Sequence, residues 1–526
     1  MRVSRNHLIV LAVLILGSLL LLLVDTQKPS VGVYFAYVLI GFIVILLFWI
    51  AWRSVEDSER PRWLISAIAV AFILRLGVGV GLFHALPVWG YADSRPHRNG
   101  FLFRDAYNRD LDAWELSRSE QSLTAAWNNP DLSDQYGGLL FLSALQYRTL
   151  SPEAHRPFLT LIITAAVGSI AVLYTWTFTN RSFNSRAGQF AAWLVALYPE
   201  AVFLSASPMR ESFLITAIAI GIEGYTRLRV GERRRGAIFI LVGFLLALVI
   251  SPPTSLILLT IVAVAWIWEG RIDRKHIIWV IVGAVVLGVG ALALTLRAWA
   301  SLEGRPGGGI LELINWWFLS GAEYQLHLLI ENSGWVQKIF GMVPEWSQLP
   351  LATAYGLIQP FLPAALMDST SAPLIRAIVS LRALGWFFLL PFLIYSLPAA
   401  LRYKGWRSLQ TYFAIIVWIG VIVASYRDAG RMWDNPRWRV ILLCIQAAIA
   451  GWAWVSARRR NNPWLLRTGI IVVFATLAFI HWEAGRYYGL PRLNLWETLF
   501  VIAAFSSVFI LGSIAYDRWR ARGNGT

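Results

Sequence analysis

Apolar segments of membrane-spanning length recur along almost the whole chain. A helix needs about 20 residues to cross the hydrocarbon core of a bilayer. The runs are continuously apolar rather than alternating, which is typical of helices and not of barrel strands. Charged residues make up 14% of the sequence, against roughly 25% in a soluble domain. The sequence therefore predicts an all-α fold, a polytopic transmembrane helical bundle of about 14 spans. The expected spans are 8–24, 31–51, 63–83, 157–178, 187–206, 212–226, 237–250, 254–268, 277–296, 376–400, 408–425, 439–455, 464–481 and 496–515.

Basic residues near the ends of these segments predict their orientation, because short cytoplasmic loops carry an excess of Arg and Lys. Arg2 and Arg5 place the N-terminus inside. We therefore expect a multi-pass protein of the cell membrane with both termini in the cytoplasm. Residues 84–156 and 297–375 are then extracytoplasmic. The basic segments that fall inside are 53–62, 181–186, 227–235, 271–275, 402–407, 458–460 and 518–522.

Residues 351–367 are apolar enough to suggest a fifteenth span, but Pro360 and Pro363 interrupt them. Each proline removes a backbone donor and disrupts a helix. A further span would also move the later basic loops to the outside. We interpret this stretch as re-entrant or interfacial. The chain then divides into a two-span extension (1–62), a core with the first outer loop (63–296), the second outer loop (297–375) and C-terminal spans (376–526).

The net charge of +16 has a plain explanation in the basic loops, so nucleic acid is not an expected partner. Nearly all of the positive charge is Arg, which reflects either genome composition or phosphate binding, where Arg forms paired hydrogen bonds. Cys444 is the only cysteine, so an internal disulfide and a cysteine metal site are excluded. The seven histidines are scattered without the spacing of metal ligands. No metal-ligating residue is predicted, and a divalent cation stays open.

The first outer loop contains the densest group of carboxylates, arginines and aromatic residues, between residues 100 and 115. Asp105, Asn108 and Asp112 are spaced to share one face of a helix. Asp105 has two plain roles open to it, an N-cap or part of a solvated acidic face. Alternatively, a carboxylate near the lipid headgroups acts as a general base while Arg104 and Arg109 beside it hold a phosphate.

Two further outer turns carry charged residues. Arg210 and Glu211 begin a span, where they form either a snorkelling pair or a catalytic pair near the first group. The arginines of 427–439, among them Arg431 and Arg437, lie on the presumed outer face against the positive-inside trend. A lipid phosphate is their natural partner, and neutralisation by nearby aspartates is the alternative.

Two charges fall inside expected spans. Arg75 is in the middle of a span, which makes it a functional candidate by default. Glu223 is close enough to the inner end of its span to snorkel.

The order of these features resembles the GT-C superfamily of membrane glycosyltransferases, over roughly residues 63–270. A span is followed by an outer loop with an Asp105-Ala-Tyr107 motif, then Asp110, an interfacial segment at 137–147, two spans and a Pro-Met-Arg210-Glu211 turn. Within that superfamily the sequence resembles bacterial relatives of the protein O-mannosyltransferases and of the lipid A aminoarabinose transferase, a glycosyltransferase family 39-like group. The C-terminal half is similar only in layout.

The resemblance implies transfer of a hexose or pentose from a polyprenyl-phosphate donor to an extracytoplasmic lipid, glycan or protein acceptor. By position it assigns the general base to Asp105, with Asp110 and Asp93 as rivals, and a second acid to Glu211. It assigns substrate binding to Arg104, Tyr107, Arg109, Arg210, Arg431 and Arg437. Three features depart from the family: two additional spans, Ser251-Pro252-Pro253 without a preceding basic residue, and Asp-Ala in place of paired acids. They leave donor type and metal use open.

We therefore expect an inverting glycosyltransferase of the cell envelope whose partners are a polyprenyl-phosphate-linked sugar and membrane lipids. A transporter or flippase for lipid-linked saccharides is one alternative, and it requires more polar residues within the membrane. A polysaccharide polymerase or ligase is another, with its main outer loop late in the chain. A non-catalytic assembly protein is the third, and it needs no phosphate-sized concavity among Asp105, Glu211 and Arg437.

Overall fold

The computed structural model describes residues 5–128, 132, 134–270, 277–300, 334–428 and 431–523, with isolated positions between 311 and 322. Within these ranges the secondary structure is entirely helical, which confirms the predicted all-α class. The helices are α1 (Arg5–Val24), α2 (Val31–Ser54), η1 (Asp57–Glu59), α3 (Arg62–Trp89), α4 (Arg95–Arg98), α5 (Arg104–Arg118), α6 (Ala125–Asn128), α7 (Gly138–Leu150), α8 (Phe158–Ser182), α9 (Ser185–Leu197), α10 (Pro199–Ala206), α11 (Glu211–Arg229), α12 (Arg233–Ile250), α13 (Pro252–Trp268), α14 (Ile277–Ala300), α16 (Gly334–Phe340), α17 (Glu345–Leu357), α18 (Leu362–Met367), α19 (Pro373–Lys404), α20 (Leu409–Asp428), α21 (Asp434–Val440), α22 (Leu443–Arg459), α23 (Trp464–Tyr488) and α24 (Leu495–Gly523).

All fourteen expected spans coincide with a helix or a bent pair of helices. Among the described residues, seven helices are long and apolar enough to cross a membrane, or nine if each of two bent pairs is one span. The remaining expected spans fall on helices that are shorter or more charged, such as α11. The protein is therefore a multi-pass membrane protein, and the count of unambiguous spans is lower than fourteen.

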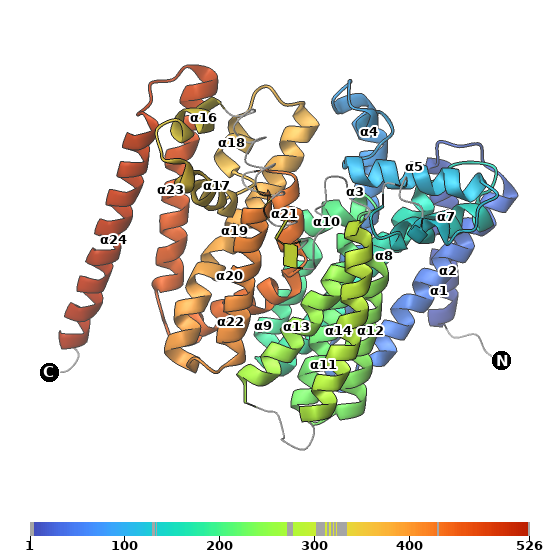
Figure 1. The fold of residues 1–526 in the computed structure, drawn as a ribbon, viewed down its shortest axis with the longest axis horizontal. Helices are drawn as coiled ribbons and strands as arrows, with labels where there is room; N and C mark the ends of the chain where they lie inside the picture. Colours follow the sequence, from blue (N-terminus) through green and yellow to red (C-terminus); the bar gives the residue numbers. More distant parts are fainter. Residues whose placement is uncertain are drawn as a thin grey trace.

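The long helices stand side by side, and the short helices gather at one end of the bundle (Figure 1). Helices α4, α5, α16 and α18 lie at the upper end of this view, while α1 begins and α24 ends at the lower end. The start of α1 and the end of α24 thus lie at the same end of the bundle.

Helix α8 forms the centre of the bundle, and the apolar window of this helix is completely buried. It packs against α2, α3, α9 and α11. Small residues allow such close packing within a membrane, where lipid is as apolar as a side chain. Gly451 of α22 is one example, because a Cβ there would lie 2.4 Å from the carbonyl oxygen of Ala187 in α9.

The N-terminal helix pair is fastened to the bundle by Asp25, which follows α1. Its carboxylate accepts a hydrogen bond from Tyr37 at 2.6 Å. It also pairs with Arg156, whose guanidinium donates to the carbonyl of Lys28 at 2.8 Å. Because Arg156 lies just before α8, this contact joins the pair to the centre of the bundle.

The stretch 351–367 is divided between α17 and α18, with residues 358–361 between them. Trp386 of α19 donates to the carbonyl of Leu357 at 3.0 Å, and Asn435 of α21 donates to that of Gly356 at 2.9 Å. The stretch is therefore not one continuous helix, and the end of α17 is attached to helices that carry site residues. The first part of the second outer loop lies largely outside the described residues.

Candidate functional site

Helix α5 presents Asp105 in its first turn with 58% of its side chain exposed. The helix begins at Arg104, and its N-cap residue is Phe103, so the N-cap explanation for Asp105 is wrong. About a quarter turn around the helix from Asp105, Ala106 and Ala113 are buried, and α5 packs against α7. The amphipathic pattern therefore fixes the helix and places Asp105 at the edge of its packed face, where the carboxylate reaches the surface.

Arg109 attaches α5 to the turn between α10 and α11. Its side chain is buried and donates to the carbonyl oxygen of Pro208, with the sulfur of Met209 at 3.8 Å. This turn is followed by Glu211, the first residue of α11, which is 5% exposed. Arg109 therefore brings the first outer loop to the start of α11, although it does so as a packing residue.

Arg437 joins three carboxylates that come from three separate parts of the chain. Its Nη2 atom lies 2.9 Å from Asp105 Oδ2 and 3.2 Å from Glu211 Oε1, and its Nη1 atom lies 3.2 Å from Asp434 Oδ1. The guanidinium also lies 5.7 Å from the centre of the Phe103 ring. Asp105 and Arg437 are 332 residues apart in sequence. We call Asp105, Glu211 and Arg437 the outer triad.

The electrostatics of the outer triad keep Asp105 ionised. Burial raises the pKa of Asp105, but the charge of Arg437 and its hydrogen bond lower it, with help from Arg210 and Arg109. The net pKa lies below the ordinary value of an aspartate. Glu211 Oε2 is buried and accepts no hydrogen bond from any described residue. The triad therefore presents one charged, exposed carboxylate and one buried oxygen with an open acceptor position.

Two further arginines, Arg382 and Arg439, belong to this part of the protein. Arg382 of α19 forms two hydrogen bonds with Glu200 of α10, at 2.6 and 2.9 Å, and donates to the Trp433 carbonyl at 3.0 Å. Arg439 lies 3.6 Å from the centre of the Trp386 ring. Both of its terminal nitrogens are buried without a partner among the described residues. The sequence interpretation included Arg439 among the arginines of 427–439 but missed Arg382, although an arginine inside an apolar span was a usable signal.

Asp110, the first rival of Asp105, does not belong to the triad. Asp110 is 4% exposed and binds Tyr147 and His155, with His155 Nε2 at 2.6 Å. Burial, together with the charge of Asp110, raises the pKa of Tyr147 well above its ordinary value. Asp110 thus holds α5 to α7 and to the loop before α8, and it faces away from the solvent that a base needs.

The remaining predicted site residues are either exposed or pack against near neighbours. Arg104 and Asp93 are exposed, Tyr107 packs with its ring centre 5.7 Å from that of Phe101, Arg210 lies 5.1 Å from the ring of Tyr136, and Arg431 pairs with Asp434 at 3.0 Å. Of this set, Arg210 and Arg431 lie close enough to the triad to act electrostatically on it or on Asp434.

Arg75 has a positioning role at the bend between α9 and α10. Pro199 has no N–H and cannot donate to the carbonyl of Val195 four residues earlier. Arg75 Nη2 donates to that carbonyl at 2.8 Å, and Nη1 donates to the carbonyl of Ala196 at 2.9 Å. The buried guanidinium thereby replaces missing donors at a helix C-terminus, where a cation is favoured. It stabilises the 44° bend that leads into α10 and Glu200.

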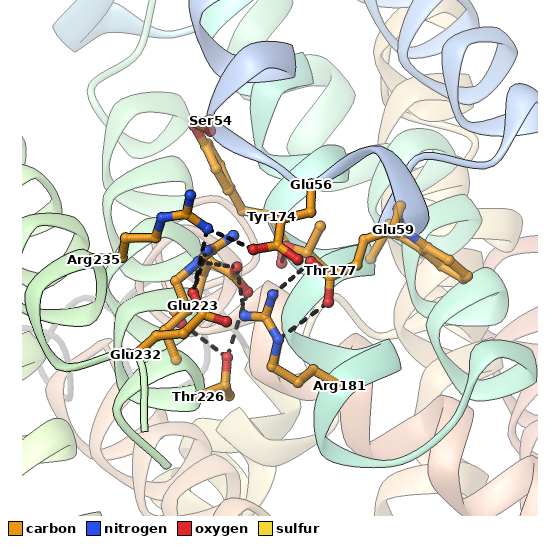
Figure 2. A network of polar contacts seen from close by, with 12 residues as sticks. Ser54, Glu56, Glu59, Tyr174, Thr177, Arg181, Glu223, Thr226, Glu232 and Arg235 are labelled. Atoms are coloured by element: carbon orange, nitrogen blue, oxygen red, sulfur yellow. Dashed lines mark hydrogen bonds and ion pairs between the residues drawn. The ribbon is translucent and has the colours of Figure 1, made fainter. Parts of the chain in front are cut away.

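The opposite end of α11 carries a different charged network (Figure 2). Glu223 accepts hydrogen bonds from Arg181 at 2.8 Å and Arg227 at 2.7 Å. Arg181 also binds Glu59. Because Glu223 is 0% exposed, the expectation that it snorkels to solvent is wrong. We call Glu59, Arg181, Glu223 and Arg227 the inner network.

In the part of the chain that the structure describes, three or more His, Cys, Asp or Glu residues nowhere gather as metal ligands would. The three carboxylates around Arg437 surround a guanidinium instead.

Comparisons with known proteins give distant structural matches only. No family model and no curated protein matches the chain. One similar solved structure is the apo form of the Archaeoglobus fulgidus oligosaccharyltransferase, with a TM-score of 0.41 and 15% identity over 86% of this chain and 57% of that one. Another is the oligosaccharyltransferase of the same organism in complex with an inhibitory peptide and a dolichol-phosphate, with a TM-score of 0.39 and 13% identity over 85% of this chain and 55% of that one.

The chain spans a little over half the length of the archaeal enzymes. At TM-scores below 0.5 the similarity carries no argument about this chain, and the function proposed below rests on the geometry of the outer triad.

Proposed function

We propose that the protein is a membrane glycosyltransferase that moves a hexose or pentose from a polyprenyl-phosphate donor to an acceptor on the extracytoplasmic side. The observation that carries this proposal is the convergence of Asp105 and Glu211 on Arg437 at one end of the bundle. Glycosyl transfer from a lipid phosphate requires a base for the acceptor and a cation for the leaving group. The triad supplies both within hydrogen-bonding distance of each other.

In the proposed reaction, the acceptor hydroxyl attacks the anomeric carbon and its proton passes to Asp105. The bond between the anomeric carbon and the phosphate oxygen breaks with inversion, and the electron pair leaves on that oxygen. Arg437 stabilises the charge that develops there, and Arg210 adds to the local positive potential. Because the pKa of Asp105 is lowered, its carboxylate is ionised at neutral pH, which is the state that a general base requires.

Glu211 has a positioning role in this account. Its Oε1 atom holds Arg437 at 3.2 Å, and its buried Oε2 atom has an open acceptor position. A hydroxyl of the sugar or of the acceptor is the group that suits this position. Asp434 holds the other side of the same guanidinium, so Arg437 is fixed before the donor binds.

One observation favours a non-catalytic assembly protein as the second candidate. The two cavities described here, of about 670 and 650 Å³, are lined by residues other than those of the triad. Neither of these two cavities therefore places a donor headgroup against the triad. A protein that only binds envelope components would need no cavity at the triad.

The test is release of polyprenyl phosphate by purified protein in liposomes, from labelled polyprenyl-phosphate hexoses and pentoses, with a membrane extract as acceptor source. Asp105→Asn should lose turnover by about 10²–10⁴-fold, the usual contribution of a general base. Glu115→Gln is the matched control, because Glu115 is exposed on the same helix about 15 Å along its axis. Equal turnover in Asp105→Asn and wild type would remove Asp105 from the reaction. Absence of turnover in every protein, with donor still bound, would favour the assembly role.

A further inference from the structure

A cavity lies where α23 ends and α24 begins. The cavity has a volume of about 650 Å³, within the usual range for ligand pockets. Its lining comes from α16, the end of α23, the connection 489–494 and the start of α24. In Figure 1, α16 lies beside the upper part of α23, at the same end of the bundle as α5.

The lining of this cavity is strongly basic. It includes Lys338, Arg486 and Arg492, and it contains no Asp or Glu. Among the described residues, Glu483 is 1% exposed and pairs with Arg486 at 2.9 Å, and the charge of Arg492 acts on the same carboxylate. The carboxylate of Glu497 accepts a hydrogen bond from the backbone of Asn494 at the start of α24. Three cations in the lining thus face one buried acid behind it, and this excess of positive charge favours an anionic ligand.

The two arginines are held in place on one aromatic ring. The guanidinium carbons of Arg486 and Arg492 lie 5.1 and 5.5 Å from the centre of the Trp482 ring. The aliphatic part of Arg492 lies against Gly485, where an added Cβ would be 2.5 Å from Arg492 Cδ. Because both cations are already ordered, binding an anion would cost little side-chain entropy.

The surroundings of the cavity favour an amphipathic anion over a soluble one. Helices α23 and α24 are the most exposed of the candidate spans, with 6% of each apolar window buried. Leu493, Leu495 and Trp496 place apolar surface beside the cations. Acyl chains lying along these helices would place the lipid headgroup at the cavity. Trp residues such as those in its lining are typical of the membrane interface.

We propose that this cavity binds the phosphate of an anionic phospholipid, with the acyl chains lying on α23 and α24. The proposal is independent of the proposed glycosyl transfer, because the residues of the cavity are separate from the outer triad. It assigns a role to basic residues on a side of the membrane where the positive-inside bias predicts few of them.

The test measures lipid binding to delipidated full-length protein in nonionic detergent by native mass spectrometry. The probes are phosphatidylglycerol, phosphatidylcholine and glycerol 3-phosphate. We expect preferential binding of phosphatidylglycerol, which the double variant Lys338→Gln, Arg492→Gln should weaken about tenfold or more. The control, Arg518→Gln with Arg520→Gln, removes two exposed charges at the other end of α24 and should leave binding unchanged.

Two glycine variants test whether binding depends on the position of Arg492 when the charge of the site is unchanged. Gly485→Ala should weaken phosphatidylglycerol binding because the new Cβ displaces Arg492, whereas Gly512→Ala on α24 meets no atom within 4 Å and should have no effect. Equal binding of phosphatidylglycerol and phosphatidylcholine would overturn the proposal. So would unchanged binding in the Lys338, Arg492 double variant. Equal affinity for glycerol 3-phosphate would overturn the lipid assignment in favour of a soluble phosphate.

Discussion

The two ends of α11 carry the same residue types in opposite circumstances. Glu211 at its start belongs to the outer triad, and Glu223 belongs to the inner network about 18 Å along the helix axis. Glu223 is 0% exposed and is held by Arg181 and Arg227. In the outer triad the guanidinium of Arg437 serves Asp105 and Glu211, and it also pairs with Asp434. Asp105 exposes 58% of its side chain. A buried, mutually paired network stabilises the bundle, whereas a shared cation beside an exposed acid is available to a ligand.

The inner network is the place to expect the largest loss of stability. Glu223→Gln keeps the shape of the side chain but leaves Arg181 and Arg227 buried beside a neutral group. Removing one partner of a buried ion pair costs about 3–5 kcal/mol. We expect a loss of that size in the free energy of unfolding in detergent. Glu232→Gln is the control, because Glu232 is 28% exposed and a loss of about 1 kcal/mol or less is expected there.

Among variants of the arginines at the outer end of the bundle, Arg437→Gln should reduce turnover most strongly. It removes the guanidinium that pairs with Asp105, Glu211 and Asp434. Loss of one preorganised donor to a developing anion typically costs about 10²–10³-fold in kcat. Arg431→Gln provides the matched control, since the side chain of Arg431 is 42% exposed and pairs with Asp434, which is not a member of the outer triad. Equal effects of the two variants on kcat would contradict the assignment of Arg437.

Arg75→Met tests whether a buried positioning residue affects the outer end at a distance. It leaves the carbonyls of Val195 and Ala196 without their donors, at a cost of about 1–3 kcal/mol each for a buried unsatisfied group. We expect lowered stability together with a raised KM for the donor, because the bend into α10 loosens. A loss of stability with KM unchanged would confine Arg75 to a structural role.

The pH dependence of turnover should separate the outer triad from an ordinary exposed aspartate. The pKa of Asp105 is lowered by Arg437 despite burial, so its carboxylate stays ionised as pH falls until that lowered pKa is reached. The same ion pair contributes stability above the unfolded pKa and loses it as pH falls through the folded pKa. In Arg437→Gln the pKa of Asp105 rises, so the acid limb of kcat/KM should move to higher pH. An acid limb at the same pH in both proteins would exclude Asp105 as the titrating base.

The sequence predicted the helical segments well because apolar runs and membrane thickness fix them locally. It also singled out Asp105, Glu211 and Arg437, since charged residues beyond span ends are conspicuous in an apolar chain. It could not predict that Asp110 is buried against Tyr147 and His155, because packing of α5 against α7 decides that. The pairing of Arg382 with Glu200 spans 182 residues. No local pattern indicates such a contact.

The most direct test compares Asp105→Asn with Glu223→Gln in the same preparation, measuring turnover per folded protein and the midpoint of thermal unfolding. The two variants should give opposite results. Asp105→Asn should lose turnover while its midpoint stays close to that of the wild type, because its side chain is largely exposed. Glu223→Gln should unfold at a clearly lower temperature while its folded fraction keeps turnover. A loss of stability without loss of turnover in Asp105→Asn would contradict the account.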